Sequence, residues 1–273
     1  MSDHARFTGS VPEHYDRDLG PVIFSGYAAD LARRVAFHNP ERVLEIAAGT
    51  GIVTRHLRDL LPTSAHLTVT DINPPMLDVA RTKFRSGEQV AFQPADACAL
   101  PFPDGAFDVV VCQFGVMFFP DKAQSYREVH RVLAPGGRYL FNVWDSHRYN
   151  PFGRITHELV QRLFPSDPPQ FYHVPFGYHE IDPIKKALIE ARLTDTTTAV
   201  VRQETEVANL AAFARGLVCG NPLAEQIKVR DSVDPGRVVD ALTDVLRGEI
   251  GADPGRTPLQ AIVFEAGKHR IAA

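Results

Sequence analysis

Short apolar runs alternate with helix-like segments along the middle of the chain, from residue 42 to residue 144. Each run is bounded by glycine, proline or polar residues, which is typical of a buried strand, and the segments between the runs repeat their apolar positions at helical spacing. This alternation predicts a parallel sheet covered by helices. Pro135, Gly136 and Gly137 are expected to end the last of these helices in a turn. The expected strands are 43–47, 67–70, 90–92, 109–112 and 139–143, and the expected helices are 53–61, 76–84 and 122–133.

The flanks of this region have a different pattern. Residues 22–37 have amphipathic spacing, which predicts a helix before the first strand. After Trp144 the alternation stops, and residues 147–178 are rich in proline, histidine and aromatic side chains. We expect the sheet to resume as a hairpin-like pair that is interrupted by two mainly helical insertions. The elements expected after the first insertion are a helix over 181–192, a strand over 194–204, a helical stretch over 206–248 and a strand over 259–264.

Composition and charge narrow the class of protein. The chain has 273 residues, of which 44% are hydrophobic and 23% charged, as in an ordinary globular protein. A net charge of −4 lacks the basic footprint of nucleic-acid binding. Three cysteines without close spacing argue against a disulfide framework or a structural metal site. The N-terminus has no signal-peptide core, and no apolar run reaches the ~18 residues that span a bilayer. We therefore expect a cytoplasmic protein without a metal, a nucleic-acid partner or a membrane-inserted segment.

The loop after the first expected strand carries the strongest chemical signal. In LEIAAGTG, small residues at 47, 49 and 51 follow Glu45 at every second position. Small residues let the backbone approach a ligand closely and present free amide groups to it. Ligands bind beyond the carboxyl ends of parallel strands, so residues that end several strands should share one site. The pattern indicates a nucleotide-like cofactor at the edge where Gly49, Asp71, Asp96 and Gln113 are expected.

Two cofactors fit a glycine-rich loop of this kind. A dinucleotide fingerprint needs a third glycine for close packing of helix on strand, but Thr54 stands at that position. A Tyr-x-x-x-Lys pair of the kind used by nicotinamide-dependent oxidoreductases is also missing after the fourth expected strand. An NAD-dependent oxidoreductase is therefore the less favoured reading.

Four segments together resemble a known family. LEIAAGTG, TDINPPML, ADACALPFPDGAFDVVVCQFGVMFFPD and REVHRVLAPGGRYLF stand in the order and spacing of class I S-adenosylmethionine-dependent methyltransferases. Over residues 42–144 the chain resembles the small-molecule members, particularly the group of ubiquinone and menaquinone biosynthesis methyltransferases. Ala47 departs from the first glycine of the family's Glu/Asp-x-Gly-x-Gly-x-Gly motif. The resemblance implies transfer of a methyl group from S-adenosyl-L-methionine, leaving S-adenosyl-L-homocysteine.

The resemblance also implies a fold and a division of the chain. The expected fold is α/β, a Rossmann-like, doubly wound, mostly parallel seven-stranded sheet with an antiparallel last strand and helical cap insertions. The expected parts are an N-terminal lid and helix (1–40), an S-adenosylmethionine-binding core (41–146), a cap insertion (147–180), a continuation of the core (181–205), a second helical cap insertion (206–250) and the last core strand (251–273).

Roles for individual residues follow from the same resemblance. Glu45 and the small-residue loop would hold the methionine part of the cofactor. Asp71 would accept both ribose hydroxyls, and Asp96 would read the adenine amino edge. The lid would close over the cofactor with two aromatic residues. The complete expected set is Tyr15, Phe24, Glu45, Ala47, Gly49, Thr50, Gly51, Asp71, Ile72, Met76, Asp96, Ala97, Gln113 and Phe114.

The methyl acceptor is expected to be a small, apolar or aromatic molecule. Aromatic residues follow the fourth strand and crowd the first insertion, which favours such a ligand. A histidine there could deprotonate a phenol or alcohol, although positioning alone can carry this chemistry. Whether the chain forms a homodimer stays open. The residues expected on the acceptor side are His14, Tyr15, Phe118, His173 and Tyr178, with His157 and His179 as further candidate bases.

Structural roles compete with several of these assignments. Glu45 could cap a loop, Asp71 could cap a helix, Asp96 could form only a turn, and Met76 could fill the core. At the level of the whole protein, a non-catalytic module that binds the cofactor or a partner would carry the same motifs. A methyltransferase acting on macromolecules is disfavoured by the acidic charge and by Cys112-Gln113-Phe114-Gly115, which is not an Asn/Asp-Pro-Pro-Tyr/Phe motif.

Overall fold

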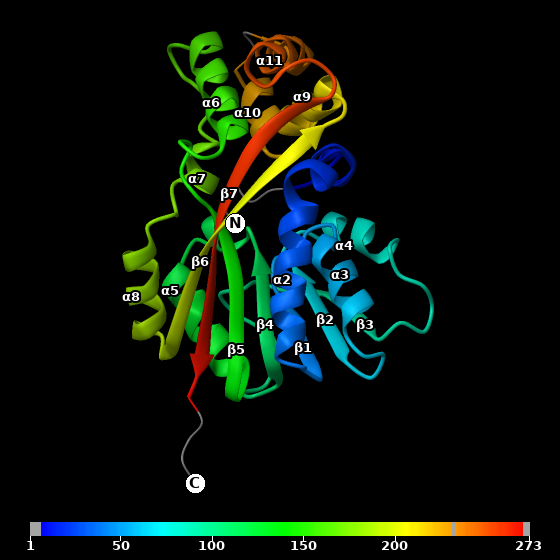
Figure 1. Cartoon of the computed structure of the whole chain (residues 1–273), viewed down its shortest axis with the longest axis vertical. Helices are drawn as coiled ribbons and strands as arrows, with labels where there is room; N and C mark the ends of the chain where they lie inside the picture. Colours follow the sequence, from blue (N-terminus) through cyan, green and yellow to red (C-terminus); the bar gives the residue numbers. More distant parts are fainter. Residues whose placement is uncertain (1–6, 231–232, 270–273) are drawn as a thin grey trace.

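The computed structural model describes residues 7–230 and 233–269 (Figure 1). Residues 1–6 of the predicted lid, 231–232 of the second predicted cap and 270–273 of the last predicted part lie outside the described residues. Within the part that is described, no helix combines the length and the apolar character needed to cross a membrane.

The sheet has seven strands in the order β3-β2-β1-β4-β5-β7-β6. Neighbouring strands from β3 to β5 pair in parallel, whereas β7 runs antiparallel to both β5 and β6. This arrangement confirms the predicted fold class, including the hairpin-like last pair. The strands are β1 (Arg42–Glu45), β2 (His66–Asp71), β3 (Val90–Pro94), β4 (Phe107–Gln113), β5 (Leu133–Trp144), β6 (Leu193–Val207) and β7 (Gly255–Lys268).

Helices cover both faces of the sheet because successive strand residues point to opposite sides. In β4, Val109 and Val111 pack with the helices of one face, and Val110 and Cys112 belong to the apolar cluster of the other face. Each fully buried valine stabilises the fold by about 1.5–3 kcal/mol. The first face carries α2 (Ser25–Phe37), α3 (Ile52–Leu60) and α4 (Pro74–Arg81), and the second carries α5 (Lys122–Val132) and α8 (Ile181–Glu190).

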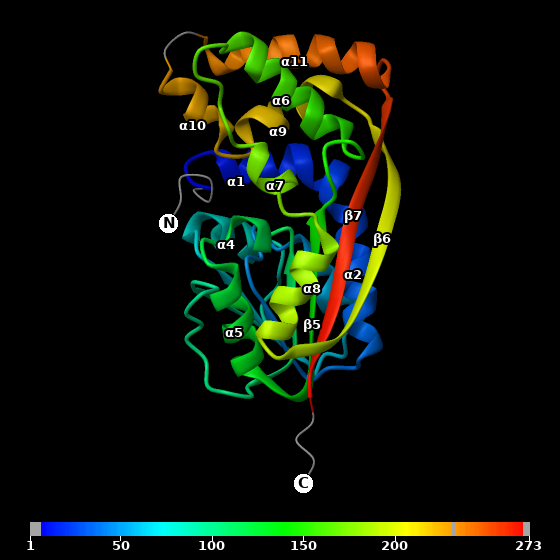
Figure 2. The ribbon, with the colours of Figure 1, turned by 90° about the vertical axis from the view of Figure 1, so that its left-hand side faces the viewer.

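The chain becomes helical earlier than the sequence predicts. The expected helix over 22–37 is α2, but it is preceded without a break by α1 (Val11–His14) and by η2 (Tyr15–Phe24), a π-helix that contains Pro21. Proline lacks an amide donor and usually ends an α-helix, so sequence pattern alone placed the start too late. The early start matters because α1 and η2 lie over the carboxyl edge of the sheet (Figure 2).

The last predicted helix of the core ends in a strand, not in a free turn. β5 begins at Leu133, directly after α5, and it contains the Pro135–Gly137 stretch that was expected to form a turn. The irregularity is still present, because the pairing of β4 with β5 shifts register between Phe107 and Val109. Gly136 has a φ of +84°, so the turn-forming residues form a bulge in the strand.

The two predicted insertions pack together as a helical cap at the carboxyl ends of the parallel strands (Figures 1 and 2). α11 packs against both α6 and α9, and α9 also packs against η2. A 3-10 turn, η3 (Val116–Phe118), follows β4 beneath this cap. The cap helices are α6 (Pro151–Leu163), α7 (His173–Phe176), α9 (Leu210–Cys219), α10 (Leu223–Lys228) and α11 (Pro235–Ile250).

Candidate functional site

A pocket lies where the carboxyl ends of the strands meet the lid and the cap. It encloses about 1310 Å³ of empty space, its open mouth included. Loops after β1 to β4 form its floor, η2 forms one wall, and residues from α6, α7 and α9 form the other. We call the part beside the strand-end loops the cofactor half, and the part beneath α6, α7 and α9 the acceptor half.

The loop after β1 takes left-handed backbone conformations at alternate residues. The φ angles of Ala47, Gly49 and Gly51 are +52°, +57° and +75°. A side chain at Gly51 would also place its Cβ atom 2.9 Å from the Cβ atom of Ala80, so glycine is required there twice over. Ala47 holds the same kind of conformation with a Cβ atom, at a cost of about 1–2 kcal/mol. The spacing of small residues in the sequence therefore reflects the shape of this loop.

Glu45 braces the loop from behind the pocket. Its side chain is buried and accepts a 2.6 Å hydrogen bond from the hydroxyl group of Thr54, the residue at the place of the missing third glycine. Burial, with the charge of Asp71 adding to it, raises the pKa of Glu45 to about 8. Neither Glu45 nor Thr50 nor Gly51 lines the pocket, so these three predicted binding residues stand behind the lining.

Asp71 ends β2 at the floor of the pocket. One of its carboxylate oxygens accepts from the amide of Gly49 at 2.9 Å, and the other accepts from the amide of Asn73 at 2.8 Å. Burial raises the pKa of Asp71 against the opposing effect of these hydrogen bonds. The oxygen bound to Asn73 also accepts from the side-chain amide of that residue at 3.2 Å. Because each carboxylate oxygen can accept more than one hydrogen bond, the oxygen bound to Gly49 retains acceptor capacity at the pocket floor.

The next two strand ends supply the far side of the cofactor half. Ile72 and Met76 flank the floor, and the methyl group of Met76 lies close to Gly49. Asp96 accepts a 2.8 Å hydrogen bond from the amide of Cys98 and lines the pocket together with Ala97. Asp96 therefore forms a turn and also lines the pocket.

The end of β4 places an amide and an aromatic ring at the centre of the pocket. Gln113 donates to the carbonyl of Phe24 at 3.4 Å, and its buried Oε1 has no partner among the described residues. Phe114, with a φ of +50°, stacks on Trp144 at a ring-centroid distance of 4.0 Å. The amide side chain of Asn142 fixes this kink by accepting from the amide of Phe114 at 3.0 Å.

The N-terminal lid closes the cofactor half with aromatic rings. Tyr15 stacks on Phe24 at a centroid distance of 4.6 Å, and Phe7 packs edge-on against Tyr15. Burial, with the negative charges of Asp71 and Asp16 adding to it, raises the pKa of Tyr15 far above its ordinary value, so its phenol is neutral. Both lid residues predicted to touch the cofactor therefore line the pocket.

The acceptor half is almost entirely aromatic. The hydroxyl of Tyr172 donates to the carbonyl of Leu217 at 2.8 Å and accepts from the amide side chain of Asn221 at 3.3 Å. Among the described residues that line this pocket, there is no histidine, lysine or arginine. Its lining consists mainly of Trp144, Phe118, Phe119, Phe152, Phe171, Tyr172, Pro175, Phe176, Leu217 and Asn221.

Three residues predicted on the acceptor side lie elsewhere. His14 contacts the carboxylate of Asp18 at 3.1 Å, where the lid packs against α9. His173 packs against the ring of His157, and the hydroxyl of Tyr178 pairs with that of Tyr126 at 2.9 Å. None of these side chains, and neither His157 nor His179, lines the pocket. The structure brings none of the predicted histidines to the lining, and His157 and His173 of the cap pack against each other, whereas Phe118 and Tyr15 line the pocket.

Sequence reasoning also missed several lining residues. Four of them, Leu19, Ile23, Phe152 and Leu217, come from helices whose apolar positions serve both the core and the cavity, so periodicity cannot separate the two uses. Trp144 was visible only as the end of a strand, and Asn221 only as a polar residue in a helical stretch. The missed residues include Phe7, Leu19, Ile23, Asn73, Trp144, Phe152, Leu217 and Asn221.

The fold is similar to that of Rossmann-like methyltransferases of known structure. Residues 44–141 match the family model described as a methyltransferase domain. More particularly, the chain resembles methyltransferases of quinone biosynthesis. It is 42% identical over 139 residues to a demethylmenaquinone methyltransferase of Thermus thermophilus, covering 50% of this chain and 61% of that protein. It is 45% identical over 101 residues to a ubiquinone/menaquinone biosynthesis C-methyltransferase of Hahella chejuensis, covering 36% of this chain and 41% of that protein.

The chain thus matches less than two thirds of the length of these two relatives. Similar solved structures extend over nearly the whole chain but are distant in sequence. The YcgJ protein of Bacillus subtilis superposes with a TM-score of 0.57 at 20% identity, covering 90% of this chain and all of that one. Phosphoethanolamine N-methyltransferase 2 of Haemonchus contortus, in complex with S-adenosyl-L-methionine, gives 0.62 at 17% identity, covering 99% of this chain and 60% of that one. At these identities the likeness concerns the fold.

Proposed function

We propose that this protein binds S-adenosylmethionine in the cofactor half of the pocket and transfers its methyl group to a small aromatic molecule in the acceptor half. One observation carries the proposal. Except for Glu45, Thr50 and Gly51, every residue that the resemblance assigns to the cofactor lines this one pocket. They come from four strand ends and the lid, so their meeting is a property of the fold rather than of neighbouring sequence.

The residues fit the groups of this cofactor. Asp71 is oriented by two backbone amides. The oxygen bound to Gly49 can accept one ribose hydroxyl, and the other oxygen can accept the second hydroxyl in place of the side-chain amide of Asn73. Met76 and Ile72 offer apolar surfaces to the adenine, and Asp96 offers an acceptor to its amino group. The unpartnered Oε1 of Gln113 is a buried acceptor that an ammonium group of the methionine part would satisfy.

When bound, the cofactor supplies an electrophilic sulfonium methyl group. The residues of this chain would align the acceptor and keep water away. Orientation of two reactants is worth roughly 7–11 kcal/mol of the barrier. Burial raises the pKa of both Tyr15 and Tyr172 above the ordinary range, so neither phenol is a base near neutral pH. The acceptor must then bring a nucleophile that needs no histidine or lysine of the pocket.

The acceptor we propose is a flat ring of the quinone type in its reduced, dihydroxy form, because the oxidised quinone is an electrophile and cannot attack the methyl group. Stacked and edge-on rings around the acceptor half favour a planar apolar ligand, for example at Phe118 and Phe171, whose centroids are 5.9 Å apart. The names of the relatives from Thermus thermophilus and Hahella chejuensis support a quinone. We also propose a cytoplasmic location. The absence of a nucleic-acid partner stays a prediction, and the formation of a homodimer stays open.

Calorimetric titration of the purified protein with S-adenosylmethionine, S-adenosylhomocysteine and NAD tests the cofactor. Micromolar binding of the two adenosyl ligands without binding of NAD is the expected result. Incubation with methyl-labelled S-adenosylmethionine and reduced 1,4-naphthoquinones then tests transfer. Binding of NAD alone would refute the proposal, and binding of the adenosyl ligands without transfer to any acceptor would favour a non-catalytic module.

A further inference from the structure

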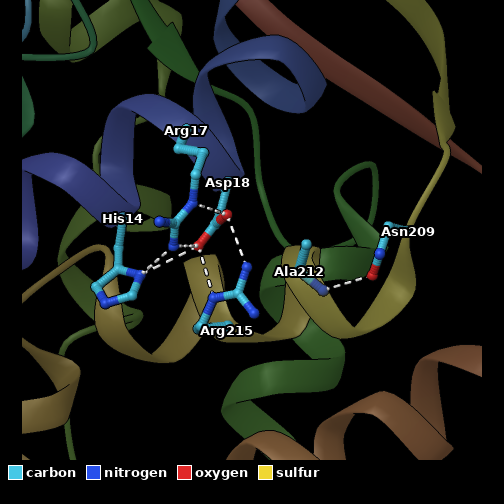
Figure 3. A network of polar contacts seen from close by, with 6 residues as sticks. All are labelled: His14, Arg17, Asp18, Asn209, Ala212 and Arg215. Carbon is cyan, nitrogen blue, oxygen red and sulfur yellow. Dashed lines mark hydrogen bonds and ion pairs between the residues drawn. The ribbon is translucent and has the colours of Figure 1, made fainter.

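The two walls of the pocket are joined by one buried carboxylate. Asp18 lies in η2, and its side chain is only 2% exposed. Arg215 of α9 grips it with two hydrogen bonds, from Nε at 2.9 Å and from Nη2 at 3.0 Å (Figure 3). Arg17 and His14, from the lid side, contact the same carboxylate at 2.8 and 3.1 Å. Burial opposes the charge, but these hydrogen bonds outweigh it and hold the pKa of Asp18 well below its usual range.

Each partner of this pair belongs to a different half of the pocket. η2 supplies Tyr15 and Phe24 to the cofactor half. α9 supplies Leu217 to the acceptor half, where its carbonyl accepts from Tyr172. The pair therefore connects an element that faces the cofactor with one that faces the acceptor.

Beside the Asp18–Arg215 pair, η2 and α9 pack directly against each other where glycine residues leave room for close approach. A Cβ atom at Gly216 would lie 2.8 Å from the Cβ atom of Asp18 and equally close to the side chain of Leu19. Gly220, one turn further along the chain, lies next to the backbone amide of Tyr15 in the same way. A bidentate ion pair fixes both the distance and the orientation of its two side chains. The close contacts at Gly216 and Gly220 leave no space between η2 and α9. We therefore expect η2 and α9 to move together.

We propose that Asp18 is a positioning residue that couples the two halves of the pocket through Arg215. Closure of the lid over the cofactor orders α9, and with it the Leu217 wall of the acceptor half. Cofactor binding then precedes and strengthens acceptor binding. This inference rests on the proposed function, because it needs S-adenosylmethionine or its product in the cofactor half.

Hydrogen exchange with S-adenosylhomocysteine as the probe tests the coupling. In the wild-type protein, saturating probe should slow the exchange of amides in 15–24 and also in 210–219, the latter by at least about fivefold, the low end of usual coupling. In Arg215→Gln the probe should still protect 15–24 but no longer 210–219. Arg17→Gln is the matched control, since Arg17 binds the same carboxylate from within η2 and should leave the protection of both segments intact.

The outcomes separate the two proposals. A merely structural pair would raise exchange in 210–219 equally with and without the probe and would leave the probe-dependent difference unchanged. That result in Arg215→Gln, or no probe-dependent protection of 210–219 in the wild type, would overturn the coupling alone. Failure of the wild type to bind S-adenosylhomocysteine in a calorimeter would overturn the proposed function and the coupling with it. Asp18→Asn, which keeps the shape of the side chain, should behave like Arg215→Gln.

Discussion

Replacing Asp71 should weaken cofactor binding strongly, because its carboxylate lies at the floor of the pocket and is proposed to bind the two ribose hydroxyls. Each hydrogen bond to a charged group contributes about 1.5–3 kcal/mol. Loss of the two proposed ribose contacts in Asp71→Ala would then cost about 3–6 kcal/mol. A tenfold change in Kd corresponds to about 1.4 kcal/mol. The Kd for S-adenosylhomocysteine should therefore rise by roughly 10²- to 10⁴-fold.

The conservative variant separates the ligand contacts from damage to the loop. Asp71→Asn keeps the shape of the side chain and one acceptor oxygen, which can still accept from the amide of Gly49, while its NH2 group replaces the oxygen that accepts from Asn73. We expect the loss of one ribose contact and a rise in Kd of roughly 10- to 100-fold. Asp71→Ala additionally strips a partner from the buried amide of Gly49, and its melting temperature should drop below that of Asp71→Asn.

The assay is calorimetric titration at a temperature where thermal melting shows each variant to be folded. Asp108→Asn is the control, because Asp108 accepts from the backbone and guanidinium of Arg42 at the opposite ends of β1 and β4. It should bind S-adenosylhomocysteine like the wild type. A folded Asp71→Asn with an unchanged Kd would refute the assignment of Asp71 to the ribose.

Three further predictions concern the loop after β1. Gly51→Ala should lower stability by about 1–3 kcal/mol, through the left-handed φ and the contact with Ala80, and a wild-type urea midpoint would contradict the geometry. Ala47→Gly should raise stability by up to about 1 kcal/mol, because strain relief exceeds the added chain entropy; a lowered midpoint would speak against strain. The raised pKa of Glu45 means that its contribution to stability is full below the ordinary pKa of 4.5 and declines as pH rises toward about 8. Between pH 5 and pH 8, Glu45→Gln should therefore show a smaller fall in unfolding free energy than the wild type, and parallel curves would argue against a protonated Glu45.

The core of the fold could be predicted from the sequence because periodicity records burial. The strand around Val109–Val111 is a short apolar run and the helix over 53–61 has amphipathic spacing, as expected for a buried sheet covered by helices. The π-helix around Pro21 could not be predicted, because a proline normally ends a helix and tertiary packing against α9 overrides that tendency here.

The floor of the pocket, formed by the strand-end loops, could be predicted better than the wall formed by α6, α7 and α9. Ala47, Asp71 and Gln113 follow strand ends, and the topology brings such ends together whatever the cap does. The residues that line this wall depend on how helices far apart in the sequence pack on one another. His173 and Tyr178 are close to lining residues in the chain, yet their side chains turn toward His157 and Tyr126 instead of the cavity. No local sequence pattern predicts the orientation of these two side chains.

The stacked pair of Phe114 and Trp144 gives the molecule an optical property. Trp144 is the single tryptophan of the chain, and its indole forms part of the pocket wall at a centroid distance of 4.0 Å from Phe114. Its emission therefore reports on the wall of the cavity. Quinones accept energy and electrons from excited indole rings, so a ligand of that type should extinguish the fluorescence on entry. The protein can then report the filling of its own cavity, without a label, at the concentrations and speeds of a stopped-flow mixing experiment.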